Sequence, residues 1–359
     1  MSSRDQMTAG GDRPGPDGAE AEAGQAVAAA WQALAPLMDL VTPMALRVAA
    51  TLRLADFMPD DGTGEGADLG ELAERAGAAP DALARVLRHL VQHGVFAEPR
   101  PGRFAANQAA ALLRAGQPAA AWLDLDGFGG RMDLAFTGLM HTVRTGEPAW
   151  EQVFGQPFWD WLDANPAISA SFDAVMAVDG GNCAVADGYG WSTVRQVADI
   201  GGGTGTLIAE VLRRNPHLHG TLAELPETAA RAQEYLAGLG LDTRCEVVGQ
   251  SFFDPLPAGA DVYLLSRVIH DWDDDDATAI LRRCAEAAGS GGRVLMIESA
   301  AAGGDPASFA EMNLRMLVLA GGRERTVDDY AALAASAGLK ITAIRHTTER
   351  HIAIECAPV

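Results

Sequence analysis

The sequence predicts an α/β fold, with a parallel sheet in the C-terminal half and a mainly helical N-terminal half. Three features support this prediction. From residue 186 onward, short apolar runs alternate with helical patterns, which is typical of a parallel sheet covered by helices on both faces. One of these runs ends in a glycine-dense turn, as the ligand-binding edges of such sheets do. The N-terminal half combines apolar residues at helical spacing with a helix-turn-helix pattern.

Composition limits the classes of function. The chain has 359 residues, of which 48% are hydrophobic, so it can bury a large core across two or more units. Its formal net charge of −21 opposes binding to a polyanion, which requires clustered Lys and Arg. No apolar stretch approaches the roughly 20 residues of a membrane span, and the N-terminus lacks the layout of a signal peptide. We therefore expect a cytoplasmic protein that binds neither nucleic acid nor a membrane.

Four segments are expected along the chain. Residues 1–25 are rich in Gly, Ala, Pro and acidic residues, which cannot offset the entropy of ordering, so this segment predicts a disordered tail. Residues 26–115 are expected to form a winged-helix dimerisation domain. Residues 116–185 are expected to form a helical linker that contributes to a substrate pocket, and residues 186–359 the α/β domain.

The N-terminal domain is predicted from its local pattern. Apolar residues recur at helical spacing from Val27 to Met58, which predicts long helices with an apolar face. Two further helices and two short strands are expected at residues 68–77, 79–90, 95–98 and 102–105. A winged helix can bind DNA, but Arg85, Arg88 and Arg103 are few in a very acidic chain. The pattern therefore favours a dimerisation module.

Histidine and cysteine spacing gives no metal site. His89 and His93 lie four residues apart and could share one helix face, but no Cys or carboxylate completes a ligand set nearby. We expect a solvated or capped pair. The cysteines occur singly, which predicts buried reduced thiols at Cys183, Cys245, Cys284 and Cys356.

The α/β domain shows a regular alternation. Strands are expected at residues 194–200, 220–224, 244–248, 261–265 and 292–298, and helices at residues 207–214, 227–238 and 275–288. In a parallel sheet, ligand residues lie at the carboxyl ends of the strands. The polar residues that fall at these ends are Asp199, Glu224, Ser251, Ser266 and Glu298.

The glycine-dense turn indicates which ligand this edge holds. Glycines at positions 201, 203 and 205 permit positive φ and let backbone N–H groups approach a ligand. A dinucleotide site has a further Gly three residues after the second, but that position is Thr206 here. Asp199 and Glu224 suit a ligand that carries an α-amino group and a ribose diol without a phosphate. S-adenosylmethionine is such a ligand, and a nicotinamide dinucleotide remains the alternative.

The run His270-Asp271-Trp272 follows the expected strand 261–265 at the same edge. An imidazole with its ordinary pKa near 6.5 can accept a proton from a phenol near pH 7, so His270 is the candidate general base. The alternative is structural: Asp271 and Asp273 would cap the next helix, and His270 would be hydrogen-bonded for packing. The nearby glycine turn favours the catalytic role.

Three motifs in this order resemble the small-molecule O-methyltransferases, a family with plant phenylpropanoid and bacterial polyketide-tailoring members. They are Asp199-Ile200-Gly201-Gly202-Gly203-Thr204-Gly205, His270-Asp271-Trp272 and Gly321-Gly322-Arg323-Glu324-Arg325-Thr326. The similarity spans roughly residues 30–359, and residues 42–44, 47–56 and 314–318 resemble the anthracycline branch. The resemblance implies a Rossmann-like class I methyltransferase sheet, a helical and winged-helix dimerisation domain, and a homodimer. It also implies S-adenosylmethionine as cofactor, no metal, and a fused-ring phenol as substrate.

The resemblance assigns cofactor contacts. Gly201 would line the methionine part, Glu224 would accept both ribose hydroxyls, and Ser266 would contact the methionine end. Ser251 and Phe252 would border the adenine, although relatives usually have Asp at position 251. The expected cofactor-binding set is completed by Asp199, Gly203, Leu225 and Arg267.

The resemblance also assigns the catalytic groups. Glu298 and Glu324 would flank His270, orient the imidazole and stabilise its protonated form, with Asp271 beside them. In the polyketide branch an apolar residue can stand at the position of His270, and proximity of the reactants then suffices. Because in-line methyl transfer gains much from positioning in a dry site, loss of His270 would slow the reaction without abolishing it.

Aromatic and thioether side chains concentrate in residues 116–185 and suit a flat polycyclic acceptor. The expected acceptor-binding residues are Trp159, Phe172, Met176, Asp271, Arg315 and Met316. Arg315 could bind a carbonyl or quinone oxygen, and a salt bridge to Glu311 is its structural alternative. Three other functions stay open: a nicotinamide-dependent oxidoreductase, a winged-helix regulator, and a family relative that binds S-adenosylmethionine but hydroxylates or decarboxylates.

Overall fold

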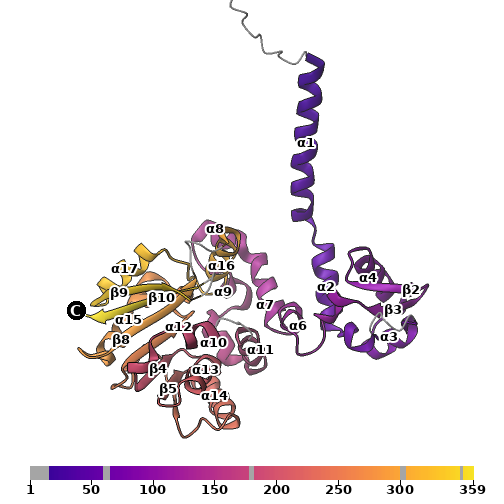
Figure 1. The fold of residues 1–359 in the computed structure, drawn as a ribbon. Coiled ribbons are helices and arrows are strands. Elements are labelled where there is room, and N and C mark those ends of the chain that lie inside the picture. The colour runs from indigo at the N-terminus through magenta and orange to yellow at the C-terminus, as the bar shows by residue number, and fades with distance from the viewer. Residues whose placement is uncertain (1–15, 60–64, 178–181, 300–304, 348–350) are drawn as a thin grey trace, which may run out of the picture. The chain divides into compact units, whose positions relative to one another are not determined.

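The computed structural model describes residues 16–59, 65–177, 182–299, 305–347 and 351–359 (Figure 1). The chain forms two compact units, Met1–Ala111 and Leu112–Val359, each described here by itself. The break between them falls a few residues before the boundary after residue 115 that the sequence predicts.

The first unit contains the predicted winged-helix pattern. Its helices are α1 (Pro16–Met38), α2 (Val41–Thr51), the 3-10 turn η1 (Leu54–Phe57), α3 (Leu69–Ala76), α4 (Pro80–Gln92) and α5 (Gln108–Ala111). Strands β1 (Ala67–Asp68), β2 (Phe96–Arg100) and β3 (Arg103–Ala106) form an antiparallel sheet in the order β1-β3-β2. The sequence predicts helices α3 and α4 and two of the three strands, β2 and β3. Asp68 starts α3 by accepting hydrogen bonds from the backbone N–H groups of Gly70 and Glu71.

Helix α1 corrects two expectations. Residues 16–25 belong to this helix rather than to a disordered tail, while residues 1–15 lie outside the described part of the chain. The stretch Gly24–Thr51 is also long and apolar enough to cross a membrane by length and composition, contrary to the expectation that no stretch approaches that length. A single such stretch near the N-terminus is a weak indication of a membrane protein, and Asp39 interrupts the helix, where its carboxylate accepts a hydrogen bond from Val41 N at 2.8 Å.

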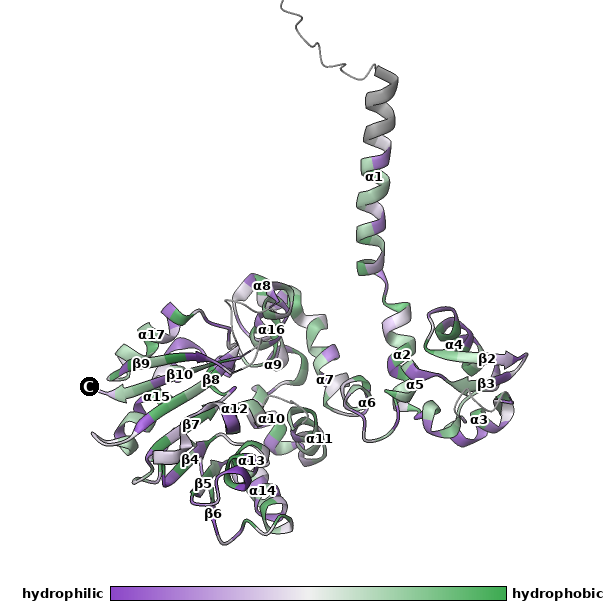
Figure 2. Cartoon of the chain, in the orientation of Figure 1, coloured by the Kyte–Doolittle hydropathy of each residue, from purple (hydrophilic) through white to green (hydrophobic). Residues whose placement is uncertain are grey.

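Helices α1 and α2 contain many apolar residues (Figure 2). Many of these side chains are exposed. The exposed large apolar side chains are Val27, Trp31, Leu34, Leu37, Met38, Leu40, Val41 and Met44. A row of this kind on a single chain indicates an interaction surface.

The three arginines and the two histidines considered in the sequence analysis all make contacts within the first unit. Arg85 pairs with Asp81 at 2.8 Å, and Arg88 lies 3.5 Å from Glu98. Arg103 donates to backbone carbonyls, including that of Gly66 at 2.6 Å. The side chain of His89 bonds to Thr42 Oγ1 at 2.9 Å, and His93 Nδ1 bonds to the backbone carbonyl of His89 at 2.9 Å, so both histidines make local contacts.

The second unit is built on a seven-stranded sheet in the order β6-β5-β4-β7-β8-β10-β9. The strands are β4 (Gln196–Ile200), β5 (His219–Glu224), β6 (Cys245–Gly249), β7 (Val262–Ser266), β8 (Arg293–Ser299), β9 (Leu339–His346) and β10 (His351–Pro358). Strands β4 to β8 are parallel, as predicted. The predicted strands end at β8; beyond it the structure adds an edge that the sequence does not predict, in which β10 pairs antiparallel with both β8 and β9.

Helices cover both faces of this sheet (Figure 1). Alternate strand residues pack into two cores: one contains Tyr263 and Leu265 and packs against α15 (Asp274–Ala288) and α17 (Val327–Ser336). The other contains Val262 and Leu264 and packs against α12 (Asn182–Gly188), α13 (Thr206–Arg214) and α14 (Pro226–Gly238). This period-2 alternation of buried residues explains why the strands read as continuous apolar runs.

A third core lies in the helical segment before the sheet. Its helices are α6 (Pro118–Leu123), α7 (Phe128–Ala135), the 3-10 turn η3 (Phe136–Gly138), α8 (Leu139–Thr145), α9 (Ala149–Phe154), α10 (Phe158–Ala164) and α11 (Pro166–Met176). They pack with α16 (Pro306–Leu319), which comes from the C-terminal part of the chain. The linker is therefore a helical lobe completed by α16.

The cysteines agree with the sequence prediction where they are described. Cys245, Cys284 and Cys356 are free and buried. The side chain of Cys183 lies outside the described residues.

Candidate active site

The cavity of the second unit opens where the order of the sheet reverses direction. The first strand, β4, lies between β5 and β7, so the chain leaves β4 toward one side of the sheet and returns to β7 on the other. In open α/β sheets, ligands bind in the crevice at such a point. A cavity of about 1120 Å³ occupies this place and extends into the helical lobe.

One end of the cavity is formed by the glycine turn after β4. Gly201, Gly203 and Gly205 all have positive φ, as predicted. A Cβ at Gly202 would lie 2.5 Å from Asp199 Oδ2, so the turn folds directly over that carboxylate and excludes any side chain.

Asp199 is an unusual group at this turn. Its side chain is 1% exposed, and neither carboxylate oxygen has a hydrogen-bond partner among the described residues. Burial, with the negative charge of Glu224, raises the pKa of Asp199 to about 7. A buried acceptor without a donor is suited to a ligand that brings one.

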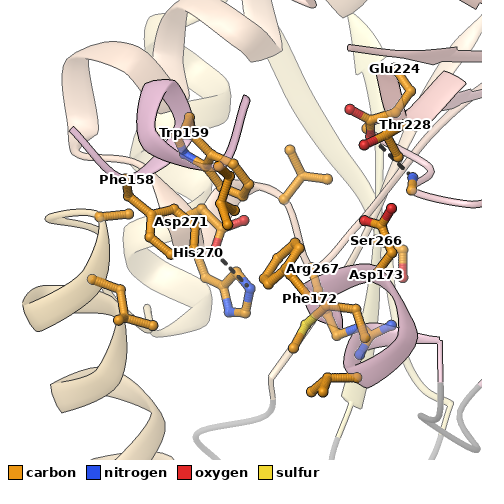
Figure 3. A pocket seen from close by; sticks show the side chains of 18 of the residues that line it. Phe158, Trp159, Phe172, Asp173, Glu224, Thr228, Ser266, Arg267, His270 and Asp271 are labelled. Atoms are coloured by element: carbon orange, nitrogen blue, oxygen red, sulfur yellow. Dashed lines mark hydrogen bonds and ion pairs between the residues drawn. The ribbon is translucent and has the colours of Figure 1, made fainter. Parts of the chain in front are cut away.

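Glu224 ends β5 and lies beside the turn. Its Oε2 accepts a hydrogen bond from Gly203 N at 3.1 Å, and its Oε1 accepts one from Leu225 N at 2.7 Å. These bonds fix the carboxylate in orientation, while burial raises its pKa. Figure 3 shows Glu224 on the same side of the cavity as Asp173 and Ser266.

The remaining cofactor candidates also line this end. Ser251 Oγ accepts a hydrogen bond from Phe253 N at 3.2 Å, so the hydroxyl shapes its own loop. A Cβ at Gly201 would lie 3.4 Å from the ring of Phe252, which brings that ring against the glycine turn. Arg267, next to Ser266, has a φ of 56°, a conformation that non-glycine residues seldom adopt, and its N–H donates to Ile297 O at 2.8 Å.

His270 lies at the centre of the cavity wall, on the 3-10 turn η5 (Ile269–Asp271) that follows β7. Its side chain is buried, and Figure 3 shows the carboxylate of Asp271 beside it. Nδ1 donates to Glu324 Oε1 at 2.8 Å, and Nε2 lies 3.5 Å from Asp271 Oδ1. The bond to Glu324 orients the ring and leaves Nε2 on the side of Asp271, which also lines the cavity.

The charges around His270 change its proton affinity. Burial lowers the pKa of His270, but the carboxylates of Asp271, Glu324 and Glu298 outweigh it and raise the pKa to about 10. Burial in turn raises the pKa of Asp271 to about 6, with His270 opposing the change. The pKa of His270 in the ligand-free protein therefore lies above the ordinary value near 6.5 that the sequence analysis uses, and the surrounding carboxylates favour the imidazolium.

Glu298 and Glu324 both stand behind His270 and do not line the cavity. Only Glu324 contacts the imidazole. Glu298, which is completely buried, accepts a hydrogen bond from Ile269 N at 2.9 Å and so holds the backbone of the turn. Contrary to the expectation, Glu298 therefore does not bond to the imidazole ring itself but fixes the backbone next to it.

The structural alternative for the acidic residues applies to one of them. Asp273 caps α15 by accepting a hydrogen bond from Asp276 N at 2.9 Å. Asp271 does not cap that helix, because its carboxylate faces His270.

The other end of the cavity is aromatic. Its lining includes all four apolar residues that the sequence assigns to the acceptor: Trp159, Phe172, Met176 and Met316. Trp159 and Trp272 have nearly parallel rings, with an interplanar angle of 16° and centroids 6.0 Å apart. Trp272 also meets Phe252 edge-on at 5.6 Å, so one ring connects the two ends of the cavity.

Arg315 on α16 both forms a salt bridge and lines the cavity, so it is compatible with each of the two roles that the sequence analysis considers. Its Nε donates to Glu311 Oε1 at 3.2 Å, which is the salt bridge at helical spacing. The guanidinium also lines the cavity, lies over the ring of Trp122 at 5.6 Å and contacts Met132 Sδ at 2.9 Å.

A polar group that the sequence does not predict borders the cavity near Glu224. Asp173 on α11 accepts a hydrogen bond from Arg231 Nε on α14 at 2.7 Å, and Arg231 also donates to Ser169 and Thr228. Asp173 is 7% exposed and lines the cavity (Figure 3). The only signal in the sequence was a carboxylate within an apolar helix, which did not reveal its distant partner.

Comparison with known families agrees with this arrangement. Residues 136–340 match the O-methyltransferase domain, and residues 36–116 match the O-methyltransferase dimerisation domain. The chain belongs to the O-methyltransferase family.

Two curated relatives of this O-methyltransferase are similar over most of their length. A 2,7-dihydroxy-5-methyl-1-naphthoate 7-O-methyltransferase of Streptomyces carzinostaticus is 45% identical over 88% of this chain and 94% of its own. The aclacinomycin 10-hydroxylase RdmB of Streptomyces purpurascens is 47% identical over 86% of this chain and 84% of its own.

Solved structures give the same fold. The O-methyltransferase NcsB1 from neocarzinostatin biosynthesis, in complex with S-adenosylmethionine and 2-hydroxy-5-methyl naphthoic acid, has a TM-score of 0.82 and 43% identity over 90% of this chain and 98% of its own. TnmH has a TM-score of 0.85 and is 44% identical, and the match covers 92% of this chain and 98% of TnmH. In the described part of this O-methyltransferase, no three His, Cys, Asp or Glu side chains form a group that could hold a metal ion.

Proposed function

We propose that this O-methyltransferase moves the methyl group of S-adenosylmethionine to a phenolic oxygen of an aromatic polyketide of the naphthoate or anthraquinone type, and that it acts as a cytoplasmic homodimer. The observation that carries the proposal is the single cavity that joins Glu224 and the glycine turn at one end, His270 in the middle and the aromatic wall at the other. Its volume of about 1120 Å³ exceeds that of a site for one small ligand.

The cofactor end fits S-adenosylmethionine. Glu224, fixed by two backbone N–H groups, can accept two charge-assisted hydrogen bonds from a vicinal diol. The acidic groups of Asp199 and Glu224 at this end favour a cationic ligand, whereas the carboxylate of Asp173 is already paired with Arg231. When bound, S-adenosylmethionine supplies an electrophilic methyl group on a sulfonium.

His270 supplies the acid-base chemistry. The imidazole accepts a proton only in its neutral form, and positive charge placed in the cavity favours that form. A phenol held at Nε2 then loses its proton to His270, while Glu324 stabilises the imidazolium through Nδ1. Asp271 borders the same position and can hold the acceptor hydroxyl before transfer.

The acceptor end fits a flat ring system. Trp159 and Phe172 offer rings for stacking, and Met176 and Met316 offer adaptable apolar contacts. Arg315 is available for a carbonyl or carboxylate of the acceptor. The two curated relatives support this class, since one acts on a naphthoate and the other is named for the anthracycline aclacinomycin.

Hydroxylation is the second candidate function, because the relative at 47% identity is a 10-hydroxylase. The pair formed by His270 and Glu324 favours methyl transfer, since it is arranged to remove a proton from an acceptor at the cavity wall. The nicotinamide-dependent alternative is not favoured by the family, and binding of NADPH in place of S-adenosylmethionine would revive it.

The test is incubation with methyl-labelled S-adenosylmethionine and a panel of hydroxynaphthoates, hydroxyanthraquinones and anthracycline aglycones, followed by mass spectrometry. A labelled methyl on a phenolic oxygen, with S-adenosylhomocysteine as co-product, supports the proposal. Gain of an oxygen atom without the label supports hydroxylation. We expect His270→Ala to lower methyl transfer by about 10²-fold or more, and unchanged turnover would reduce His270 to a packing residue.

The homodimer has a separate test. The exposed apolar row on α1 and α2 overlaps the dimerisation domain and would be covered by a second copy. Light scattering should give the mass of two chains for the wild type, and Trp31→Glu with Leu37→Glu should give a monomer. A monomeric wild type would contradict this part of the proposal.

A further inference from the structure

One charged side chain near the active site has a role that neither the cofactor nor the acceptor explains. Arg325 is 1% exposed, yet it does not line the cavity. Its Nη1 donates to Ile269 O at 2.8 Å, and its Nη2 donates to Trp272 O at 2.7 Å. These two carbonyls stand on either side of His270 and Asp271, so one guanidinium spans the turn that carries the base.

The carboxylate of Asp274 completes this arrangement. Asp274 Oδ1, in the first turn of α15, accepts from Nη2 of Arg325 at 2.8 Å and from Nε at 3.1 Å. The buried positive charge is therefore paired and hydrogen-bonded, which is the condition under which burial of a charge is tolerated. Only arginine has a rigid fork of donors that can reach two carbonyls and a carboxylate together, and lysine cannot reproduce it.

The loop that contains Arg325, residues 322–325, contacts the turn at residues 269–272 at two further points. Arg323 N donates to His270 O at 2.8 Å. A Cβ at Gly322 would lie 2.1 Å from His270 O and 2.4 Å from the carbonyl carbon of Asp271, so the loop approaches the turn too closely for any residue but glycine. The run from Gly322 to Arg325 thus holds the carbonyls of three residues in the turn, while Glu324 in its middle reaches the imidazole.

We propose that Arg325 is a positioning residue, whose guanidinium ties both ends of the turn at residues 269–272 and so holds His270 against Glu324. This inference rests on the proposed function of His270 as the base. Without the guanidinium, the turn keeps its sequence but loses the two bonds that fix its ends. His270 then samples orientations in which Nδ1 no longer meets Glu324, and methyl acceptors meet a misplaced Nε2.

The test compares Arg325→Lys with Arg244→Lys. Arg244 is a matched control, because its guanidinium also holds backbone carbonyls, those of Leu212, Pro216 and Leu218, but it lies at β6, away from the cavity that contains His270. The first readout is the titration of His270 in the ligand-free protein, by NMR with ring-labelled histidine, with the signal assigned through His270→Asn. The second is the pair of kcat and the dissociation constant of S-adenosylmethionine.

For Arg325→Lys we expect the titration midpoint of His270 to fall by about one pH unit or more, and kcat to fall by about tenfold or more, with cofactor affinity unchanged. Arg244→Lys should lower thermal stability but leave the midpoint and kcat at wild-type values. If Arg325→Lys leaves both the midpoint and kcat as they are in the wild type, the positioning role is overturned.

Two further results keep the outcome clear. If Arg325→Lys does not fold, Asp274→Asn removes the half-exposed carboxylate instead and should shift the His270 midpoint in the same direction by a smaller amount. Because the titration needs neither acceptor nor turnover, it tests the positioning role even if the wild type methylates nothing in the panel. If His270→Asn keeps full turnover while Arg325→Lys still shifts the titration, the base role fails and the structural tie stands.

Discussion

The strongest prediction concerns Glu324, whose carboxylate is the hydrogen-bond partner of His270 Nδ1 at 2.8 Å. We consider Glu324→Gln, which keeps the shape of the side chain and an oxygen that can accept the bond but removes the negative charge. The expected result is a lower pKa of His270 in the ligand-free protein. The other carboxylates that raise this pKa, those of Asp271 and Glu298, remain in place.

The magnitude follows from the geometry. With the two charge centres about 4 Å apart and an effective dielectric constant of about 20, the lost attraction is about 4 kcal/mol. Since 1.36 kcal/mol corresponds to one pKa unit, this energy lowers the pKa by about 3 units. From its value of about 10, the pKa of His270 should therefore fall to about 7.

This shift has opposite effects at low and high pH. In the ligand-free wild type, about one His270 side chain in a thousand is neutral at pH 7, whereas about half would be neutral in Glu324→Gln. At high pH His270 is neutral in both the wild type and the variant. The variant then lacks the charge of Glu324, which stabilises the imidazolium formed during the reaction. The variant should thus lose most of its activity relative to wild type at high pH and least at neutral pH.

The assays are NMR titration of ring-labelled histidine and the pH dependence of kcat for methyl transfer. Glu286→Gln, which removes an exposed carboxylate on α15, controls for the change in net charge. An unchanged His270 midpoint in Glu324→Gln would refute the electrostatic reasoning. A shifted midpoint with an unchanged pH profile of kcat would instead show that His270 is not the base.

Three other substitutions test the rest of the site. Asp199→Asn should raise the stability of the protein at pH 8 by up to about 4 kcal/mol and change it little below pH 4. The reason is that the pKa of the Asp199 carboxyl rises from 3.8 to about 7 on folding, so this group destabilises the native protein as the pH rises through that range. Equal melting temperatures for variant and wild type at pH 8 would contradict this. Glu224→Gln should weaken S-adenosylmethionine binding by about tenfold or more in calorimetry while the KM of the acceptor stays the same. Arg315→Ala should raise the KM of the acceptor by about tenfold without changing cofactor affinity, and the opposite pattern would move Arg315 out of the acceptor site.

The strands and the glycine turn could be predicted because their signals are local. The run from Val197 to Gly205 contains both its apolar alternation and the residues that permit positive φ, so the structure of the turn follows from its own sequence. The antiparallel edge formed by β9 and β10 could not be found in this way. Its strands follow no βαβ pattern, and their pairing depends on β8, about fifty residues earlier.

The identities of the site residues were predicted better than their chemistry. His270 and Glu324 were found through motifs, and the structure brings them into contact. The pKa of His270 was not predictable, because it depends on carboxylates from three separate segments that meet only in the fold. Arg325 was missed for a related reason: two arginines flank Glu324 in the sequence, and only the fold shows that Arg325 is buried while Arg323 is exposed.

The charge arrangement also decides how substitutions of His270 should be interpreted. In the native protein the imidazolium lies among the carboxyl groups of Asp271, Glu298 and Glu324, of which Glu298 and Glu324 are buried. Removing one partner from a buried charged cluster destabilises a protein more than the cluster itself stabilises it, because the remaining charges lose their compensation. His270→Ala should therefore reduce stability as well as turnover. The loss of stability should be largest below about pH 6.5 and should shrink as the pH rises toward 10, because a histidine whose pKa is raised from 6.5 to about 10 on folding contributes its stability below that range. A variant that is inactive only because it is unfolded says nothing of the base. The double variant His270→Asn with Glu324→Gln removes one charge of each sign, so it should regain stability without regaining methyl transfer, and that separation identifies His270 as the base.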